Sequence, residues 1–183
     1  MILCTKVAKV NMVVMAGKNT QDILPMAELA KTRNIQVRFI EEMPFNGGAG
    51  LSGQAMWNNQ DILGELTKYY GAPQIMPAPH GATAQVYQWK LFQGSIGIIP
   101  AFSRTFCGQC NRMRITAQGK LKTCLYDSGV FDLKGLLRNG ASDREILNAI
   151  QDSFKHKAKD GFEAEKQRNF GLPITESMAS IGG

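Results

Sequence analysis

Three of the four cysteines of this chain lie in one short segment, FCGQCNRMRITAQGKLKTC, which runs from Phe106 to Cys124. Cys107 and Cys110 are separated by two residues, and thirteen residues lie between Cys110 and Cys124. A Cys-x-x-Cys loop lets two thiolates reach one metal centre, and a hairpin can fold a third thiol back onto it. Clustered cysteines of this kind favour a metal site in a reducing compartment over a disulfide framework. The spacing therefore predicts a metal site at Cys107, Cys110 and Cys124.

Two kinds of metal centre fit three thiolates, and the spacing alone leaves both open. Zinc needs a fourth ligand to complete its tetrahedron, and the candidates are Cys4, His80 and His156, none of them at zinc-finger spacing. A cubane iron–sulfur cluster usually has four cysteine ligands, so three thiolates leave one iron open to a substrate atom. The spacing favours the cluster over zinc, and three unrelated core thiols are the remaining alternative.

Arg112 and Arg114 follow Cys110 directly and are two residues apart. In an extended segment, residues i and i+2 point to the same side, so both guanidinium groups can face one ligand. The planar guanidinium group makes bidentate, charge-assisted contacts with phosphate. The pair therefore indicates a phosphorylated ligand beside the metal, and the simpler alternative is two surface arginines on an edge strand.

The composition is that of a globular protein with an unevenly distributed charge. The 183 residues are 44% hydrophobic and 20% charged, and the net charge is +6. No apolar run approaches the roughly 18 residues that a membrane span needs. Lys6, Lys9 and Asn11 interrupt the apolar N-terminal stretch, so we expect a strand there rather than a signal peptide, and a cytoplasmic protein without a membrane partner.

The interval between Glu65 and Asp127 contains no acidic residue, and it carries seven lysines and arginines. Such one-sided charge attracts anions, either phosphorylated small molecules or nucleic acid. A zinc-stabilised basic module that binds nucleic acid is therefore the alternative function. RNA recognition usually involves aromatic side chains on which bases stack, and none lies between Cys107 and Cys124. We accordingly expect no nucleic-acid partner.

The pattern of apolar residues predicts an α/β fold. A Val-rich run over 7–15 predicts a strand covered on both faces, and a helix over 20–33, capped by Asn19 or Thr20, leads to a β-branched strand over 35–43. This strand–helix–strand unit predicts a right-handed parallel pair. Because two strands cannot cover both of their faces, the chain is expected to be the C-terminal part of something larger.

The remaining chain alternates between shorter elements. We predict a helix over 55–70, an irregular proline-rich stretch over 71–83 and two short strands within 84–100. The cysteine segment continues as a hairpin that turns at Gln118-Gly119. Two helices are predicted over 133–138 and 142–156, and Ser142 and Glu145 form a capping-box pattern at the start of the second.

Four stretches together carry a resemblance: FCGQCNRMRITAQGKLKTCLY, GSIGIIP before it, VRFIEEMPF upstream and the terminal MASIGG. The chain resembles the C-terminal half of the radical S-adenosylmethionine (SAM) GTP 3',8-cyclases, also called molybdenum cofactor biosynthesis protein A, over essentially its whole length. The resemblance implies an incomplete parallel (β/α) barrel, of which residues 1–75 form the C-terminal part. It implies that residues 76–183 form an extension that carries a [4Fe-4S] cluster and ends in a double glycine.

The same resemblance assigns roles to individual residues. It implies that the cluster, held by its three cysteines, binds the guanine of GTP at the open iron, and that the glycine tail enters the active site. The implied residues are Cys107, Cys110 and Cys124 for the cluster; Lys9, Arg112, Met113 and Arg114 for GTP; Arg38 and Met43 for SAM; and Gly182 and Gly183 for catalysis.

The implied reaction is the first step of molybdenum cofactor biosynthesis, a lyase reaction. A radical generated from SAM at another [4Fe-4S] cluster rearranges GTP to 3',8-cyclo-7,8-dihydroguanosine triphosphate. The CxxxCxxC motif that holds that other cluster does not occur in these residues. We therefore expect the chain alone to be inactive, as a fragment, a truncated product or half of a split enzyme. Its expected partners are GTP and either a second copy of the chain or the missing N-terminal half.

Overall fold

The computed structural model describes residues 7–43, 56–103, 110–127, 131–160, 162–163 and 166. The chain divides into two compact units. The first comprises residues 1–44 and 49–106, and the second comprises residues 45–48 and 107–183. The predicted boundary after residue 75 lies within a strand of the first unit, and its assignment to a barrel part and an extension stays a prediction.

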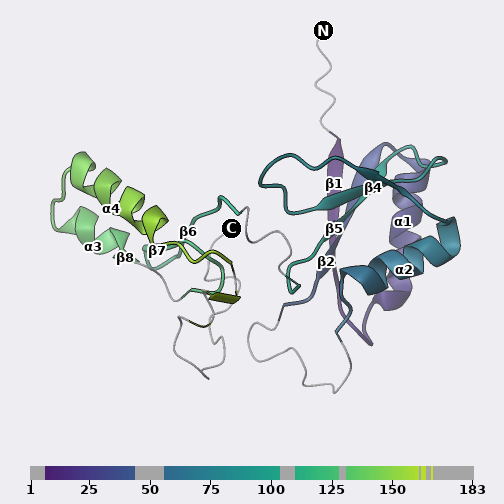
Figure 1. Cartoon of the computed structure of the whole chain (residues 1–183), viewed down its shortest axis with the longest axis horizontal. Helices are drawn as coiled ribbons and strands as arrows, with labels where there is room; N and C mark the ends of the chain where they lie inside the picture. Colours follow the sequence, from purple (N-terminus) through teal and green to yellow (C-terminus); the bar gives the residue numbers. More distant parts are fainter. Residues whose placement is uncertain are drawn as a thin grey trace, which may run out of the picture. The chain divides into compact units, whose positions relative to one another are not determined.

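The first unit is built on a five-stranded mixed sheet with the strand order β1-β2-β5-β4-β3 (Figure 1). β2 pairs in parallel with both β1 and β5, whereas β4 is antiparallel to β5 and to β3. This arrangement confirms the predicted α/β class and the parallel β1–β2 pair. The strands are β1 (Ala8–Val14), β2 (Ile35–Glu41), β3 (Gln74–Met76), β4 (Gln85–Gln88) and β5 (Ser95–Ile99).

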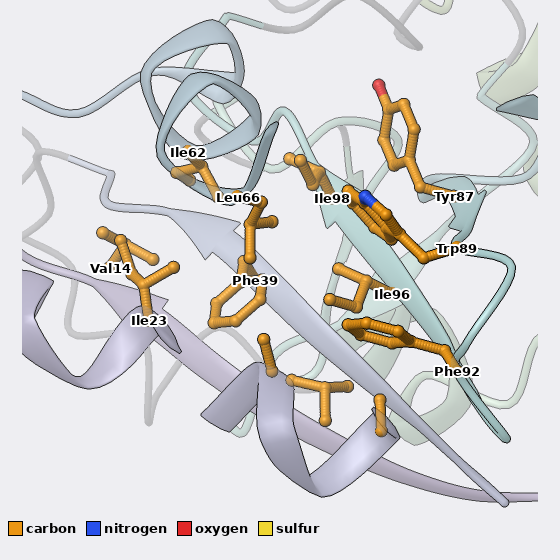
Figure 2. Close-up of a cluster of buried hydrophobic side chains, with 13 residues drawn as sticks. Val14, Ile23, Phe39, Ile62, Leu66, Tyr87, Trp89, Phe92, Ile96 and Ile98 are labelled. Atoms are coloured by element: carbon orange, nitrogen blue, oxygen red, sulfur yellow. The ribbon is translucent and has the colours of Figure 1, made fainter. Parts of the chain in front are cut away.

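Two helices cover one face of this sheet: α1 (Ile23–Thr32), which follows the short 3-10 helix η1 (Thr20–Asp22), and α2 (Asn59–Tyr70). In Figure 1 both helices lie on the same side of the strands. Figure 2 shows side chains of α2 and of the strands converging on one cluster of buried hydrophobic residues. The labelled members are Val14, Ile23, Phe39, Ile62, Leu66, Tyr87, Trp89, Phe92, Ile96 and Ile98.

The prediction that the first strand is covered on both faces is wrong. Along β1 the exposed residues alternate with less exposed ones, and Val13 is 42% exposed. β1 lies at an edge of the sheet, and the helices cover only the face from which Met12 packs against the core. Lys9, expected on a buried strand, is therefore exposed on the opposite face.

Smaller differences concern the ends of elements. The proline-rich stretch over 71–83 contains β3, which the sequence did not predict. α2 begins at Asn59, four residues later than expected, after an Asn58 cap that accepts from the backbone nitrogens of Gln60 and Asp61. Asn19 precedes η1 without capping it, because its side-chain oxygen accepts from the nitrogen of Met15.

The second unit contains a small antiparallel sheet, β6 (Arg114–Ile115), β7 (Lys120–Lys122) and β8 (Phe131–Asp132). The predicted hairpin is confirmed, and Gly119 has the positive φ of 83° that its turn requires. The two predicted helices are α3 (Leu133–Arg138) and α4 (Asp143–Lys155), which lie side by side (Figure 1). α4 begins at the predicted capping box of Ser142 and Glu145.

Among the described residues, none of the helices combines the length and the apolar composition that crossing a membrane would require.

Candidate metal and nucleotide site

Two of the three predicted metal ligands lie in the described part of the second unit. Cys110 and Cys124 are both half-buried. Cys107, Gly182 and Gly183 lie outside the described residues. The described residues contain no group of three or more histidines, cysteines or carboxylates placed to hold a metal ion. The full ligand set at Cys107, Cys110 and Cys124 therefore stays a prediction.

Asp127 organises the loop that carries Cys124. Its Oδ2 atom accepts hydrogen bonds from the backbone nitrogen of Cys124 at 2.7 Å and from the backbone nitrogen of Thr123 at 2.8 Å. The hydroxyl of Thr123 donates to the same oxygen at 3.1 Å. A short acidic side chain that accepts from nearby backbone N–H groups is typical of tight turns. These bonds fix the backbone at Cys124 just after β7 ends.

Lys157 holds the segment around Cys110 from the far end of α4. Its ammonium group donates to the carbonyl oxygen of Cys110 at 2.6 Å and to that of Arg112 at 3.2 Å. The contacts span 47 and 45 residues of sequence. They join the chain just beyond α4 to the segment that begins at Cys110.

The predicted phosphate-binding arginines lie at the start of the hairpin. Arg114 is in β6, directly opposite Lys122 of β7, and Arg112 is exposed two residues before it. Lys122 is buried, with 1% of its surface exposed. Directly opposite residues of an antiparallel strand pair lie close together on one face of the sheet. The hairpin therefore places two basic side chains side by side on that face. Met113, half-buried between the arginines, is also a described residue.

The first unit presents its predicted residues on the face that α1 and α2 leave uncovered. Arg38 lies in register with Asn11, and Lys9 with Gln36, so Lys9 and Arg38 lie on this same face of adjacent strands. The Nε atom of Arg38 donates to Gln36 Oε1 at 2.7 Å, and Gln36 Nε2 donates to Ser95 Oγ at 3.2 Å. Gln36 and Ser95 thus orient Arg38, a contact that the sequence did not predict.

Gly97 of β5 lies in register with Arg38 and leaves it room. A Cβ atom at Gly97 would lie 3.3 Å from Arg38 Cγ, a tight contact. Met43, predicted to line the SAM pocket, is half-buried two residues after β2. The two predicted sets of residues belong to different units of the chain.

Glu41 is the buried polar residue that the sequence analysis missed. Its side chain is fully buried at the end of β2, where it accepts hydrogen bonds from the backbone of Asn59 and of Phe102 and Ser103. The alternation of β2 places Glu41 on the same face as Val37 and Phe39. The sequence did contain a signal for this residue: Glu41 is acidic, yet the period of two along the strand predicts a core side chain at its position.

The described thiols fit both of the predicted metal centres, an iron–sulfur cluster and zinc. Thiolates are the usual ligands of iron–sulfur clusters, and the backbones of Cys110 and Cys124 are both held by hydrogen bonds with charged side chains. Of the predicted fourth ligands for zinc, His156 places Nδ1 2.9 Å from the carbonyl oxygen of Asp152, and His80 is an exposed residue of the other unit. Cys4 lies outside the described residues. A zinc site would have to draw its fourth ligand from these groups.

Comparison with known proteins assigns this chain to a family. Residues 35–163 match the family described as Molybdenum Cofactor Synthesis C, and the chain belongs to that family. The match includes both described cysteines, the hairpin and the helices of the second unit. It confirms the family resemblance that the sequence predicted.

Curated relatives show the same relationship. The chain is 36% identical over 178 residues to the GTP 3',8-cyclase of Moorella thermoacetica, covering 96% of this chain and 52% of that protein. The GTP 3',8-cyclase of Syntrophomonas wolfei is 36% identical over 180 residues, covering 96% of the chain and 53% of that protein. Human molybdenum cofactor biosynthesis protein 1 is 39% identical over 142 residues, which are 78% of the chain and 22% of that protein. The chain thus spans about half the length of the bacterial relatives and less of the human one.

Proposed function

We propose that this chain is the cluster- and GTP-binding portion of a GTP 3',8-cyclase, which performs the first step of molybdenum cofactor biosynthesis. The supporting observation is that Cys110 and Cys124 flank, in the sequence, the strand pair that carries Arg114 and Lys122. Membership of the Molybdenum Cofactor Synthesis C family supports the assignment of this reaction.

In this proposal the ligands of a [4Fe-4S] cluster are Cys107, Cys110 and Cys124. When bound, the cluster supplies one iron that is open to a nitrogen or oxygen atom of guanine. Arg112 and Arg114 bind the triphosphate through bidentate, charge-assisted hydrogen bonds, and Met113 lies between them. The buried ammonium of Lys122 adds positive charge to the same strand pair.

The first unit has the complementary role of binding SAM and part of GTP. Lys9 and Arg38 present their charges on the uncovered face of the sheet, where Gln36 orients Arg38. We propose that this sheet is part of a radical-SAM barrel, with Lys9 binding GTP and with Arg38 and Met43 lining the SAM site. The double glycine at 182–183 is proposed to enter the active site, where a side chain would crowd the substrate.

The complete reaction also requires the radical-generating cluster and its CxxxCxxC motif, which residues 1–183 do not contain. We therefore propose that residues 1–183 on their own bind GTP but do not convert it. The reaction type is that of a radical SAM lyase.

Anaerobic reconstitution with iron and sulfide tests the proposal. We expect about four iron and four sulfide per chain, as a [4Fe-4S] cluster requires, and a change in the cluster's absorption spectrum when GTP is added. An iron-free protein with one zinc per chain would contradict it. Competition between RNA and GTP distinguishes this function from the alternative, a module that binds nucleic acid. Binding of RNA by such a module should weaken steeply with salt and should not respond to free GTP.

A further inference from the structure

Each described cysteine has its backbone held by one charged side chain of the second unit, distant in the sequence for Cys110 and close for Cys124. For Cys110 this is the ammonium of Lys157, 2.6 Å from the carbonyl oxygen. For Cys124 it is the carboxylate of Asp127, 2.7 Å from the backbone nitrogen. Neither residue has a role in the function proposed above.

Lys157 fixes two carbonyl groups that are two residues apart, those of Cys110 and Arg112. Holding both carbonyls restricts the peptide planes between them, and with them the directions of the Cys110 thiol and the Arg112 guanidinium. Hydrogen bonds from a charged donor are stronger than neutral ones. One ammonium therefore orients a predicted cluster ligand and a predicted phosphate ligand together.

Asp127 fixes the other thiol by a different arrangement. A single carboxylate oxygen accepts from the nitrogens of Thr123 and Cys124 and from the Thr123 hydroxyl. Three donors on one oxygen hold the chain in one conformation immediately after β7. Asp127 therefore holds the backbone of Cys124, whereas Lys157 holds the backbone of Cys110.

We propose that Lys157 and Asp127 are positioning residues of the metal and nucleotide site: Lys157 for Cys110 and Arg112, and Asp127 for Cys124. The inference rests on the function proposed above. Both residues act through the backbone of the ligands rather than on the cluster or the substrate. Partners of this outer kind typically change metal affinity 10- to 100-fold when they are removed.

Alkylation of the iron-free protein tests the positioning directly. In the full chain, iodoacetamide labelling followed by peptide mass spectrometry gives separate rates for Cys110 and Cys124. We expect Lys157→Met to raise the alkylation rate of Cys110 about tenfold, because in the wild type the charge-assisted hydrogen bonds of Lys157 oppose local opening of that segment. The rate of Cys124 should stay unchanged. Asp127→Ala should do the reverse.

Three further variants control the experiment. Lys155→Met removes a neighbouring lysine that pairs with Asp152 on the surface, and both rates should stay at the wild-type value. Lys157→Arg keeps a charged donor and Asp127→Asn keeps an acceptor oxygen. In each of these two variants the cysteine should keep most of its wild-type protection from alkylation. If a substitution raised both cysteine rates equally, it would indicate general destabilisation and overturn the assignment, as would two unchanged rates.

The reconstituted protein gives the second readout. We expect Lys157→Met to lose iron to a chelator about tenfold faster than the wild type and to bind GTP about tenfold more weakly. Asp127→Ala should lose iron equally fast while its remaining loaded fraction binds GTP normally, because Arg112 is unaffected. Wild-type protein that holds no iron would contradict the proposed function, whereas normal iron retention and GTP affinity in Lys157→Met would contradict this inference alone.

Discussion

Glu41 and Ser103 are joined by two hydrogen bonds across 62 residues of sequence, with the Ser103 backbone nitrogen and hydroxyl each 2.6 Å from a different carboxylate oxygen. The same carboxylate accepts from the nitrogen of Phe102 at 2.9 Å and from that of Asn59 at 2.6 Å. One buried side chain at the end of β2 thus fixes both the start of α2 and the segment that follows β5.

Replacing Glu41 by Gln should lower the free energy of unfolding by about 3 kcal/mol, because the amide NH₂ group would face buried N–H donors. Chemical denaturation measures the change. Ser103→Ala removes only the hydroxyl bond and should cost about 1.5 kcal/mol. Glu42→Gln, at the neighbouring half-buried position, is the control and should change stability by less than about 0.5 kcal/mol. An equal effect at Glu41 and Glu42 would contradict the role of the carboxylate.

Two glycine substitutions should have opposite effects. Gly119→Ala should destabilise the protein by about 2 kcal/mol or more, because φ is 83° and the new Cβ atom would collide with the Cβ of Lys134. Gly64→Ala, in the exposed part of α2 with no neighbouring atom within 4 Å, should stabilise it by about 0.5–1 kcal/mol. Urea denaturation of both variants measures the difference, and a stabilising Gly119→Ala would refute the described turn.

Tyr70 should make stability depend on pH in alkaline solution. Burial, and then the hydrogen bond that its hydroxyl donates to Glu28 at 2.8 Å, raise the pKa of Tyr70 above its ordinary value of 10.0. The folded protein then holds the proton more tightly than the unfolded chain does. The stabilisation is complete below about pH 10 and is lost as the pH rises from there toward the folded-state pKa. Tyr70→Phe should flatten this decline, whereas Tyr69→Phe, at a position 65% exposed, should keep it.

The same substitution has a consequence in acid. The hydrogen bond from Tyr70, and then the one from Lys31, lower the pKa of Glu28 below 4.5. Stability from this carboxylate is present above about pH 4.5 and is lost as the pH falls through the lower folded-state pKa. Tyr70→Phe should therefore show a weaker decline in acid as well. Thermal melts between pH 2 and pH 12 measure both limbs, and parallel curves for wild type and Tyr70→Phe would exclude the coupling.

Cys124→Ser should abolish the cluster. With one of three thiolates lost, we expect the iron content after anaerobic reconstitution to fall close to zero and the spectral response to GTP to disappear. Iron and sulfide assays give the answer. Cys4→Ser is the matched control and should retain wild-type iron. Metal loss in both variants would instead favour a four-thiolate site that includes Cys4.

Elements with a strong local pattern were predictable from the sequence. Gly119 and the flanking β-branched and basic residues predicted the hairpin, and Ser142 with Glu145 predicted the start of α4. The exposure of β1 was not predictable, because a Val-rich run has the same local pattern at an edge as in the middle of a sheet. β3 was missed because its three residues lie between Pro73 and Pro77, which read as loop.

The candidate site divides in the same way. The cysteines and arginines were proposed as site residues from their spacing, which is a local property, and their roles stay predictions. The contacts of Lys157 with Cys110 and of Glu41 with Ser103 join residues 47 and 62 positions apart, and no short-range pattern encodes them. Glu41 occupies a position at which the alternation of its strand predicts an apolar residue, so its burial could have been suspected from the sequence. Lys157 follows the end of a helix, where lysine is common, so nothing in the sequence marked its contact.

The position of β5 between β2 and β4 also determines when the sheet can form during synthesis. β2 meets β5 only after 59 further residues, as the register of Gln36 with Ser95 shows. A ribosome adds about 5–20 residues per second, so the edge of β2 that pairs with β5 waits about 3 to 12 seconds for its neighbour. During that time the unpaired backbone groups along this edge of β2 are open to pairing with another chain.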